Sequence, residues 1–138
     1  MGNSQRDERA IFAYEKVKAV VDTNRYLQEY RSLAVRLPAM IQMQGLSMAM
    51  TYLQSKFQEK NDEGTKDKNV KDENSHYKSI YDTLVQWLQR KNVISSKGDP
   101  LEKIFKLSTA EYRYAMEEVL QLSIWLKQLA EGMIESDD

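Results

Sequence analysis

His76 is the only histidine in the 138-residue chain, so any histidine-based chemistry must centre on it. With Glu73 it forms the Glu-x-x-His spacing that supplies metal ligands in di-iron helical bundles. Such a site needs a second motif of the same kind, which one histidine cannot supply. A serine–histidine relay would need His76 in a pocket, whereas it borders a polar segment. We therefore predict a solvated residue at a helix start and no metal site.

Other chemical motifs are equally scarce. Glu117 and Glu118 are adjacent on a predicted helix, where neighbouring side chains point about 100° apart and cannot share one proton-transfer geometry, so solvated charge is the preferred interpretation. The five glycines are scattered rather than gathered in a phosphate-binding loop, and the chain has no cysteine. We expect no catalytic residue, no cofactor and no small-molecule substrate, and hence no enzyme.

Apolar residues recur at helical spacing through almost the whole chain. Two prolines and five glycines leave little material for the turns of a sheet. We predict an all-α fold, a single compact bundle of about five or six helices that forms one domain over residues 1–138. The predicted core faces contain Ala10, Ala13, Tyr14, Val17, Val20, Tyr30, Leu33, Leu37, Ile41, Ile80, Leu84, Leu88, Ala115, Val119, Leu122 and Leu126.

Several positions mark where these helices begin and end. Pro38 predicts a kink or break and Gly45 a turn. Residues 58–75 contain one large apolar residue, Val70, and we predict a mobile polar loop there. Asp99-Pro100 is typical of a helix start, and Ser108 with Glu111 matches a capping box.

Basic residues lie in lines on the predicted helices. Arg25, Ser32 and Arg36 follow one side of the second helix, where eleven residues span roughly 16 Å. Arg9 and Lys16 form a similar line on the first. Such spacing suits a phosphate backbone, and solvated charge is the alternative. Because the net charge is only −1, any RNA contact is expected to be a local strip within a larger assembly.

Large apolar residues also occur away from the predicted core faces. Tyr114 and Trp125 lie on the far side of the last helix, and Met43 and Met50 are seven residues apart on an earlier one. They predict either a protein interface or a bundle wide enough to bury this side as well. No apolar run reaches the roughly 20 residues of a membrane span, and the start of the chain lacks a secretory signal, so we expect a cytoplasmic protein with no membrane contact.

Two passages resemble the small subunit of the type III-B CRISPR, or Cmr, effector complex. They run from Tyr30 to Lys56 and from Glu111 to Glu131. Members of that family have a Leu-Pro step, a Gln-x-Gly-Leu sequence, a terminal Ser-Lys, and later Glu-Tyr-Arg and Trp-Leu-Lys. The corresponding positions are Leu37-Pro38, Gln44-Gly45-Leu46, Tyr52-Leu53-x-Ser55-Lys56, Glu111-Tyr112-Arg113 and Trp125-Leu126-Lys127. Gln44 directly precedes Gly45, without the intervening residue of the family sequence.

The resemblance implies a helical subunit without catalytic residues that stacks into a filament beside the backbone subunits. Its implied partners are the other Cmr subunits, further copies of itself, guide RNA and target RNA. A helical adaptor that never contacts nucleic acid is the alternative. The basic residues that we select for RNA binding are Lys16, Arg25, Arg31, Arg36, Lys56, Arg113 and Lys127. The segment 108–138 has two basic and seven acidic residues, which weakens the case for Arg113 and Lys127.

Overall fold

The computed structural model describes residues 5–62 and 75–137. Six helices and no strand occur within these ranges, which confirms the all-α prediction. The helices are α1 (Gln5–Thr23), α2 (Leu27–Gln44), α3 (Leu46–Asp62), α5 (Ser75–Arg90), α6 (Pro100–Phe105) and α7 (Thr109–Met133).

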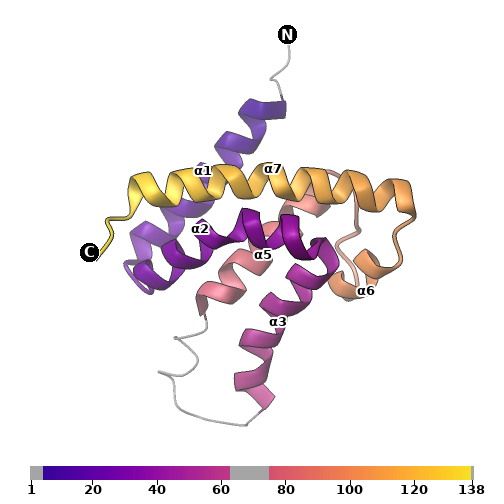
Figure 1. Ribbon diagram of the computed structural model, residues 1–138, viewed down its shortest axis with the longest axis horizontal. Coiled ribbons are helices and arrows are strands. Elements are labelled where there is room, and N and C mark those ends of the chain that lie inside the picture. Colours follow the sequence, from indigo (N-terminus) through magenta and orange to yellow (C-terminus); the bar gives the residue numbers. More distant parts are fainter. Residues whose placement is uncertain (1–4, 63–74, 138) are drawn as a thin grey trace.

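The longest helix, α7, lies across the molecule and organises the bundle (Figure 1). It packs against α2 and α1, while α3 packs against α5. The short α6 lies beside α3. Residues from α2, α3 and α5, which are far apart in the sequence, therefore meet on one side of the molecule.

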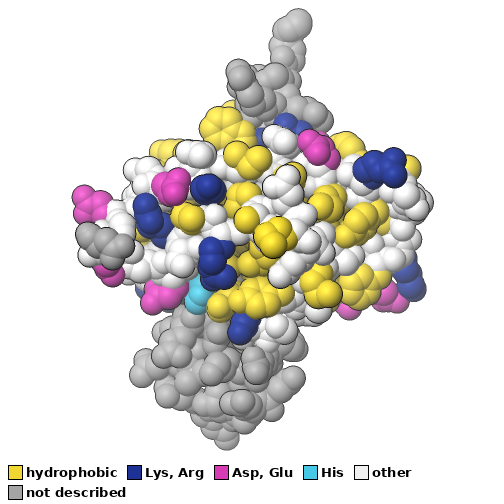
Figure 2. Space-filling view, viewed as in Figure 1, with side chains coloured by type: hydrophobic (Ala, Val, Ile, Leu, Met, Phe, Trp, Pro, Cys, Tyr) yellow, Lys and Arg dark blue, Asp and Glu magenta, His cyan; other side chains and the backbone are white. Residues whose placement is uncertain are grey.

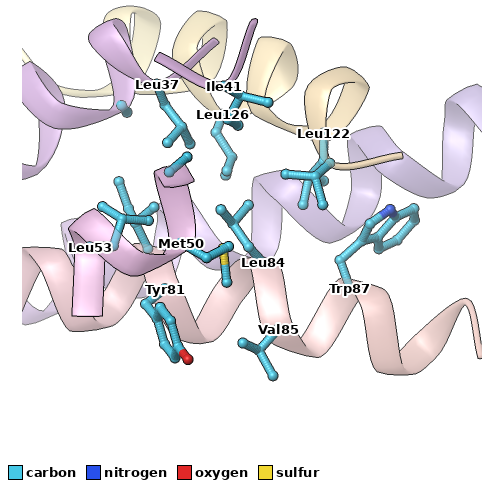
Figure 3. Packing of buried hydrophobic residues seen from close by; sticks show 14 of the residues in the cluster. Leu37, Ile41, Met50, Leu53, Tyr81, Leu84, Val85, Trp87, Leu122 and Leu126 are labelled. Carbon is cyan, nitrogen blue, oxygen red and sulfur yellow. The ribbon is translucent and has the colours of Figure 1, made fainter. Parts of the chain in front are cut away.

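One hydrophobic core draws on all six helices. Its largest fully buried side chains include Trp87 of α5, Tyr30 of α2 and Met50 of α3. Figure 3 shows Leu37 and Ile41 of α2 facing the residues of α3 and α5, with Leu122 and Leu126 of α7 beside them. On α1 the core face includes Phe12, whereas Tyr14, predicted for that face, is 46% exposed.

Both predicted helix starts are confirmed. The Asp99 side chain accepts a hydrogen bond from the Leu101 backbone N–H at 3.2 Å, and Pro100 is the first residue of α6. At the start of α7 the Ser108 hydroxyl accepts from the Glu111 N–H, while the Glu111 carboxylate accepts from the Ser108 N–H. These contacts satisfy backbone donors that have no partner inside a helix.

Pro38 and Gly45 have different outcomes. The expected break at Pro38 is absent, because α2 runs through it. Buried residues lie on both sides of the proline, and their packing outweighs the missing hydrogen bond. The turn at Gly45 is confirmed: α2 ends at Gln44, and Gly45 has a φ of 87° and a ψ of 164°, a combination that favours glycine.

The prediction of a loop at residues 58–75 is wrong at both ends. Residues 58–62 belong to α3, and residue 75 begins α5. Residues 63–74, on which most of that prediction falls, lie outside the described residues.

Candidate functional site

Four rings from three parts of the chain form a continuous series, which we call the aromatic row: Tyr26, His76, Tyr77 and Tyr52. Tyr26 directly precedes α2, His76 and Tyr77 are in the first turn of α5, and Tyr52 is in α3. Ring centroids are 6.3 Å apart for Tyr26 and His76, 4.2 Å for His76 and Tyr77, and 6.1 Å for Tyr77 and Tyr52. The three tyrosines are half-buried and His76 is buried.

A basic residue accompanies each tyrosine of the aromatic row. The Arg25 guanidinium lies 5.7 Å from the Tyr26 centroid, and the Lys56 Nζ lies 5.4 Å from the Tyr52 centroid. The Arg36 guanidinium lies close enough to the Tyr77 hydroxyl to influence its pKa. Three of the basic residues selected from the sequence are thus brought together by tyrosines that sequence reasoning did not select. Alternating cations and aromatic rings are typical of surfaces that bind single-stranded nucleic acid.

The Tyr77 hydroxyl occupies the middle of this arrangement. Burial raises the pKa of Tyr77 above its usual value, the neighbouring Tyr52 adds to the increase, and the Arg36 charge opposes it. The hydroxyl of this α5 residue thus lies near Arg36 of α2 and Tyr52 of α3. His76, predicted to be solvated, instead lies against Tyr77 with only 6% of its surface exposed.

Arg36 also borders a pocket of about 400 Å³ between α2 and the C-terminal segment. The α2 side of this pocket includes Gln28, Arg31, Ser32 and Arg36, and the other side Ser136 and Asp137. The Arg31 Nε donates a hydrogen bond to the Ile134 carbonyl at 2.9 Å, and the Gln28 Oε1 accepts one from the Asp137 backbone N–H at 3.2 Å. Arg31 and Arg36 thus share one recess on the surface of α2.

The prediction that Arg25, Ser32 and Arg36 lie in a line on one helix is wrong, because Arg25 is outside α2. α2 begins at Leu27, and Tyr26 has a φ of 41°, so Arg25 lies in the turn before the helix rather than on its surface. The left-handed backbone at Tyr26 redirects the chain. Arg25 and Arg36 are instead connected through the successive rings of the aromatic row.

The two basic residues of α1 are engaged elsewhere. The Lys16 Nζ donates a hydrogen bond to the Gln86 Oε1 and lies 5.2 Å from the Phe12 centroid. Lys16 and Tyr26 line a groove of about 240 Å³ between α1 and α5, so Lys16 borders one end of the aromatic row. Arg9, in contrast, turns inward to Glu118.

Arg9 and Glu118 form a charged pair in the interior. The Arg9 Nη2 lies 3.1 Å from the Glu118 Oε2, and the Trp87 Nε1–H donates to the Glu118 Oε1 at 3.0 Å. The two side chains are only 14% and 3% exposed. Glu118 is therefore a buried structural residue, and the prediction of solvated charge was wrong for it.

Arg113 and Lys127 both lie on α7. Arg113 is exposed and Lys127 half-buried, and no hydrogen bond or ion pair joins either of them to the described part of the aromatic row. Figure 2 shows Lys and Arg side chains down one side of the face that carries α7, α2 and α3, with hydrophobic side chains beside them.

The four residues selected for a protein interface divide into two groups. Met43 is 85% exposed and Tyr114 44%, whereas Trp125 is half-buried and packs against the core. Met50 does not fit the interface prediction, because its side chain is fully buried and points from α3 toward Leu84 of α5 (Figure 3). The turn at Gly45 separates Met43 from Met50, so the two do not share a helix register.

The described residues contain neither a metal-binding cluster nor a membrane-spanning helix. No group of three or more histidine, cysteine or carboxylate side chains in residues 5–62 and 75–137 is arranged to hold a metal ion. No helix in these ranges combines the length and the apolar composition needed to cross a bilayer.

The fold and surface define a helical protein with a small mixed aromatic and basic patch. Comparison with protein-family models matches residues 5–133 to the family described as CRISPR-associated protein (Cas_Cmr5). The match covers nearly the whole chain, and the chain therefore belongs to this family, the small subunit of type III-B Cmr complexes. Family membership implies association with the other subunits of a Cmr complex.

Proposed function

We propose that the chain is a non-catalytic, cytoplasmic subunit that stacks with copies of itself beside the backbone subunits of a Cmr complex and helps hold target RNA opposite the guide. The contact with RNA is made by the aromatic row and its flanking cations. The observation that carries this proposal is the convergence of Arg25, Arg36 and Lys56 on neighbouring tyrosines.

The chemistry of this surface suits a phosphate backbone. Guanidinium groups bind phosphate oxygens through paired N–H donors, and Arg31 and Arg36 face the same pocket. Lys56 adds a mobile positive charge beside the neighbouring ring. With a net charge of −1 the isolated chain has little general attraction for RNA, so binding is expected to be weak and dependent on the assembled complex.

Charge reversal tests the proposal. A complex reconstituted with Arg36→Glu and Lys56→Glu should load target RNA at least tenfold more weakly, and the slope of log affinity against log salt should fall by roughly 0.7–0.9 for each phosphate group that is no longer bound. The matched comparison is Arg113→Glu with Lys127→Glu, the same change of charge on α7. If only the variant with Arg113→Glu and Lys127→Glu lost RNA loading, the RNA-binding surface would be on α7 and the proposed surface would be wrong.

The alternative function is a helical adaptor without nucleic-acid contact, which the exposed Met43 and Tyr114 favour. It predicts that neither charge-reversed pair changes RNA loading and that no crosslink to RNA forms. Substitution of Tyr114 and Trp125 by alanine would then disrupt assembly alone.

A further inference from the structure

We propose that Tyr52 and Tyr77 form a stacking site for an unpaired nucleobase, between the cations Arg36 and Lys56 that hold the adjoining phosphates. This inference rests on the proposed function, because it requires that RNA reaches the aromatic row. Beyond the proposed function, it specifies that an unpaired base of the RNA is recognised and that Tyr52 and Tyr77 recognise it.

The two rings are held in place by three helices. They meet edge to face, at an interplanar angle of 78° and a centroid separation of 6.1 Å. The His76 ring packs against Tyr77 at a centroid separation of 4.2 Å, and Arg36 of α2 lies near the Tyr77 hydroxyl. A ring fixed in this way loses little freedom when a base stacks on it, which favours binding.

Both rings are nevertheless accessible. Tyr52 and Tyr77 are half-buried, so each keeps part of its surface in contact with solvent. This distinguishes them from Tyr30, which is fully buried, and from Tyr81, which is 5% exposed. Of these four tyrosines, only Tyr52 and Tyr77 combine a fixed position with a surface that a ligand can reach.

Lys56 occupies the face of Tyr52 when RNA is absent. An ammonium over an exposed ring contributes roughly a two- to fivefold preference, whereas stacking of a base contributes roughly 5- to 150-fold. A base can therefore displace the Lys56 ammonium, whose flexible side chain is then free to contact the adjoining phosphate. Lys56 lies over Tyr52 and Arg36 lies near Tyr77, so each ring of the pair has its own cation for an adjoining phosphate.

The site suits an unpaired base rather than a duplex. Bases within an A-form helix are stacked on one another, and proteins read such helices through their backbone and minor groove. An apolar side chain from a protein partner would also fit against the tyrosines, but it would gain nothing from the two flanking cations. The combination of rings and cations therefore favours a nucleotide.

Leucine and phenylalanine substitutions test the site in a reconstituted complex. Tyr52→Leu with Tyr77→Leu keeps apolar bulk for packing but removes the aromatic faces, and we expect about tenfold weaker binding of target RNA. Tyr52→Phe with Tyr77→Phe keeps the faces and should bind within about threefold of the unsubstituted complex. Thermal unfolding of each isolated chain checks that the bundle is intact.

Target RNAs with a single abasic position, moved along the sequence, identify the loss of affinity as stacking. The unsubstituted complex should bind more weakly when the abasic position reaches the site, and the leucine variant should show no further weakening there. Equal weakening in both complexes, or full binding by the leucine variant, would overturn the stacking site. Failure of the leucine variant to assemble would assign the tyrosines to a protein partner and also overturn it.

The charge-reversed pair tests the proposed function separately from the stacking site. If Arg36→Glu with Lys56→Glu leaves RNA loading unchanged, RNA does not reach this surface and both proposals fall. If that pair weakens loading while the leucine variant binds normally, the RNA contact stands and only the stacking of a base is refuted.

Discussion

Glu118 is a carboxylate inside the core that accepts hydrogen bonds from two partners, the charged Arg9 and the neutral Trp87. Because it is almost fully buried, removing it leaves the Arg9 guanidinium without its counter-charge and the indole N–H without an acceptor. The pair also connects α1, α5 and α7. Its role is therefore to fix the arrangement of these helices.

We expect Glu118→Ala to lower the free energy of unfolding by about 3 kcal/mol, because a buried charge loses its partner. Glu117→Ala is the matched control: Glu117 is exposed on the same helix, and its removal should change stability by less than about 0.5 kcal/mol. Chemical denaturation of the two variants measures both values. Similar effects of the two substitutions would show that the interior pair contributes no more than surface charge.

The Tyr30 hydroxyl is buried and has no hydrogen-bond partner among the described residues. Burial raises the pKa of Tyr30 above its usual value of 10.0, and the neighbouring Tyr26 adds to the increase. In the unfolded chain the hydroxyl loses its proton near pH 10, while in the folded chain it keeps it. The unfolded state then binds fewer protons, and stability falls as the pH rises above about 10.

We expect Tyr30→Phe to match or exceed the stability of the unsubstituted chain at pH 7, by up to about 1 kcal/mol, because no hydrogen bond is removed. At pH 11 its relative stability should increase by a further amount of about 1.4 kcal/mol, since phenylalanine has no proton to lose. Urea denaturation at the two pH values measures this. A variant that is less stable at pH 7 would point to a partner of the hydroxyl, such as a bound water.

Residues such as Glu118 and His76 show where sequence reasoning fails. Carboxylates and histidines are usually exposed, so their types favoured solvent. Burial became favourable only because Arg9 and Trp87 approach Glu118, and Tyr26 and Tyr77 approach His76. These neighbours are up to 109 positions away in the sequence, so no local sequence pattern predicts the contacts.

At the scale of elements, the turn at Gly45 determines how α3 is placed. Its positive φ allows α2 to end and α3 to begin after a single residue. The Tyr112 hydroxyl of α7 accepts a hydrogen bond from the Ser47 N–H at 2.9 Å, which fixes the first turn of α3. The turn therefore directs Met50 into the core and Tyr52 to the aromatic row.

We expect Gly45→Ala to lower stability by about 1–3 kcal/mol, because a side chain strains this backbone conformation and its Cβ would lie 3.4 Å from the Tyr112 hydroxyl oxygen. Gly132→Ala is the matched control. Gly132 is in the last turn of α7 with no atom within 4 Å of an added Cβ, so alanine should stabilise the chain by up to about 1 kcal/mol. Thermal unfolding of both variants should show shifts of opposite sign.

Helix type and extent followed well from the spacing of apolar residues, and both capping sequences formed as expected. The path of the chain between helices could not be predicted from that spacing. Pro38 is tolerated because the residues around it are buried, and Arg25 leaves the line of α2 because the backbone at Tyr26 is left-handed. Both outcomes depend on tertiary packing that periodicity does not contain.

At the scale of the whole molecule, apolar side chains remain exposed outside the core. Met43, Met48 and Phe105 are each more than half exposed. Single exposed apolar residues are ordinary, but 85% exposure of a methionine next to the α2–α3 turn suits an interface in an assembly. Such interfaces are expected of a Cmr subunit.

We expect Met43→Glu to reduce assembly of the subunit with copies of itself or with its Cmr partners at least fivefold, because a charge is poorly tolerated at a desolvated interface. Gln42→Glu adds the same charge at the adjacent exposed position and is the control. Both chains should keep their stability within about 0.5 kcal/mol. Sedimentation and co-purification measure assembly, and an unchanged complex with Met43→Glu would remove Met43 from the interface.

The C-terminal segment has a practical consequence for such experiments. Its backbone forms hydrogen bonds with the side chains of Gln28 and Arg31. Ser136 and Asp137 line the pocket that Arg36 also lines. A purification tag fused after this segment would emerge next to that pocket and obstruct whatever enters it. The first turns of α1 extend away from the bundle (Figure 1), so a tag fused there leaves the pocket open.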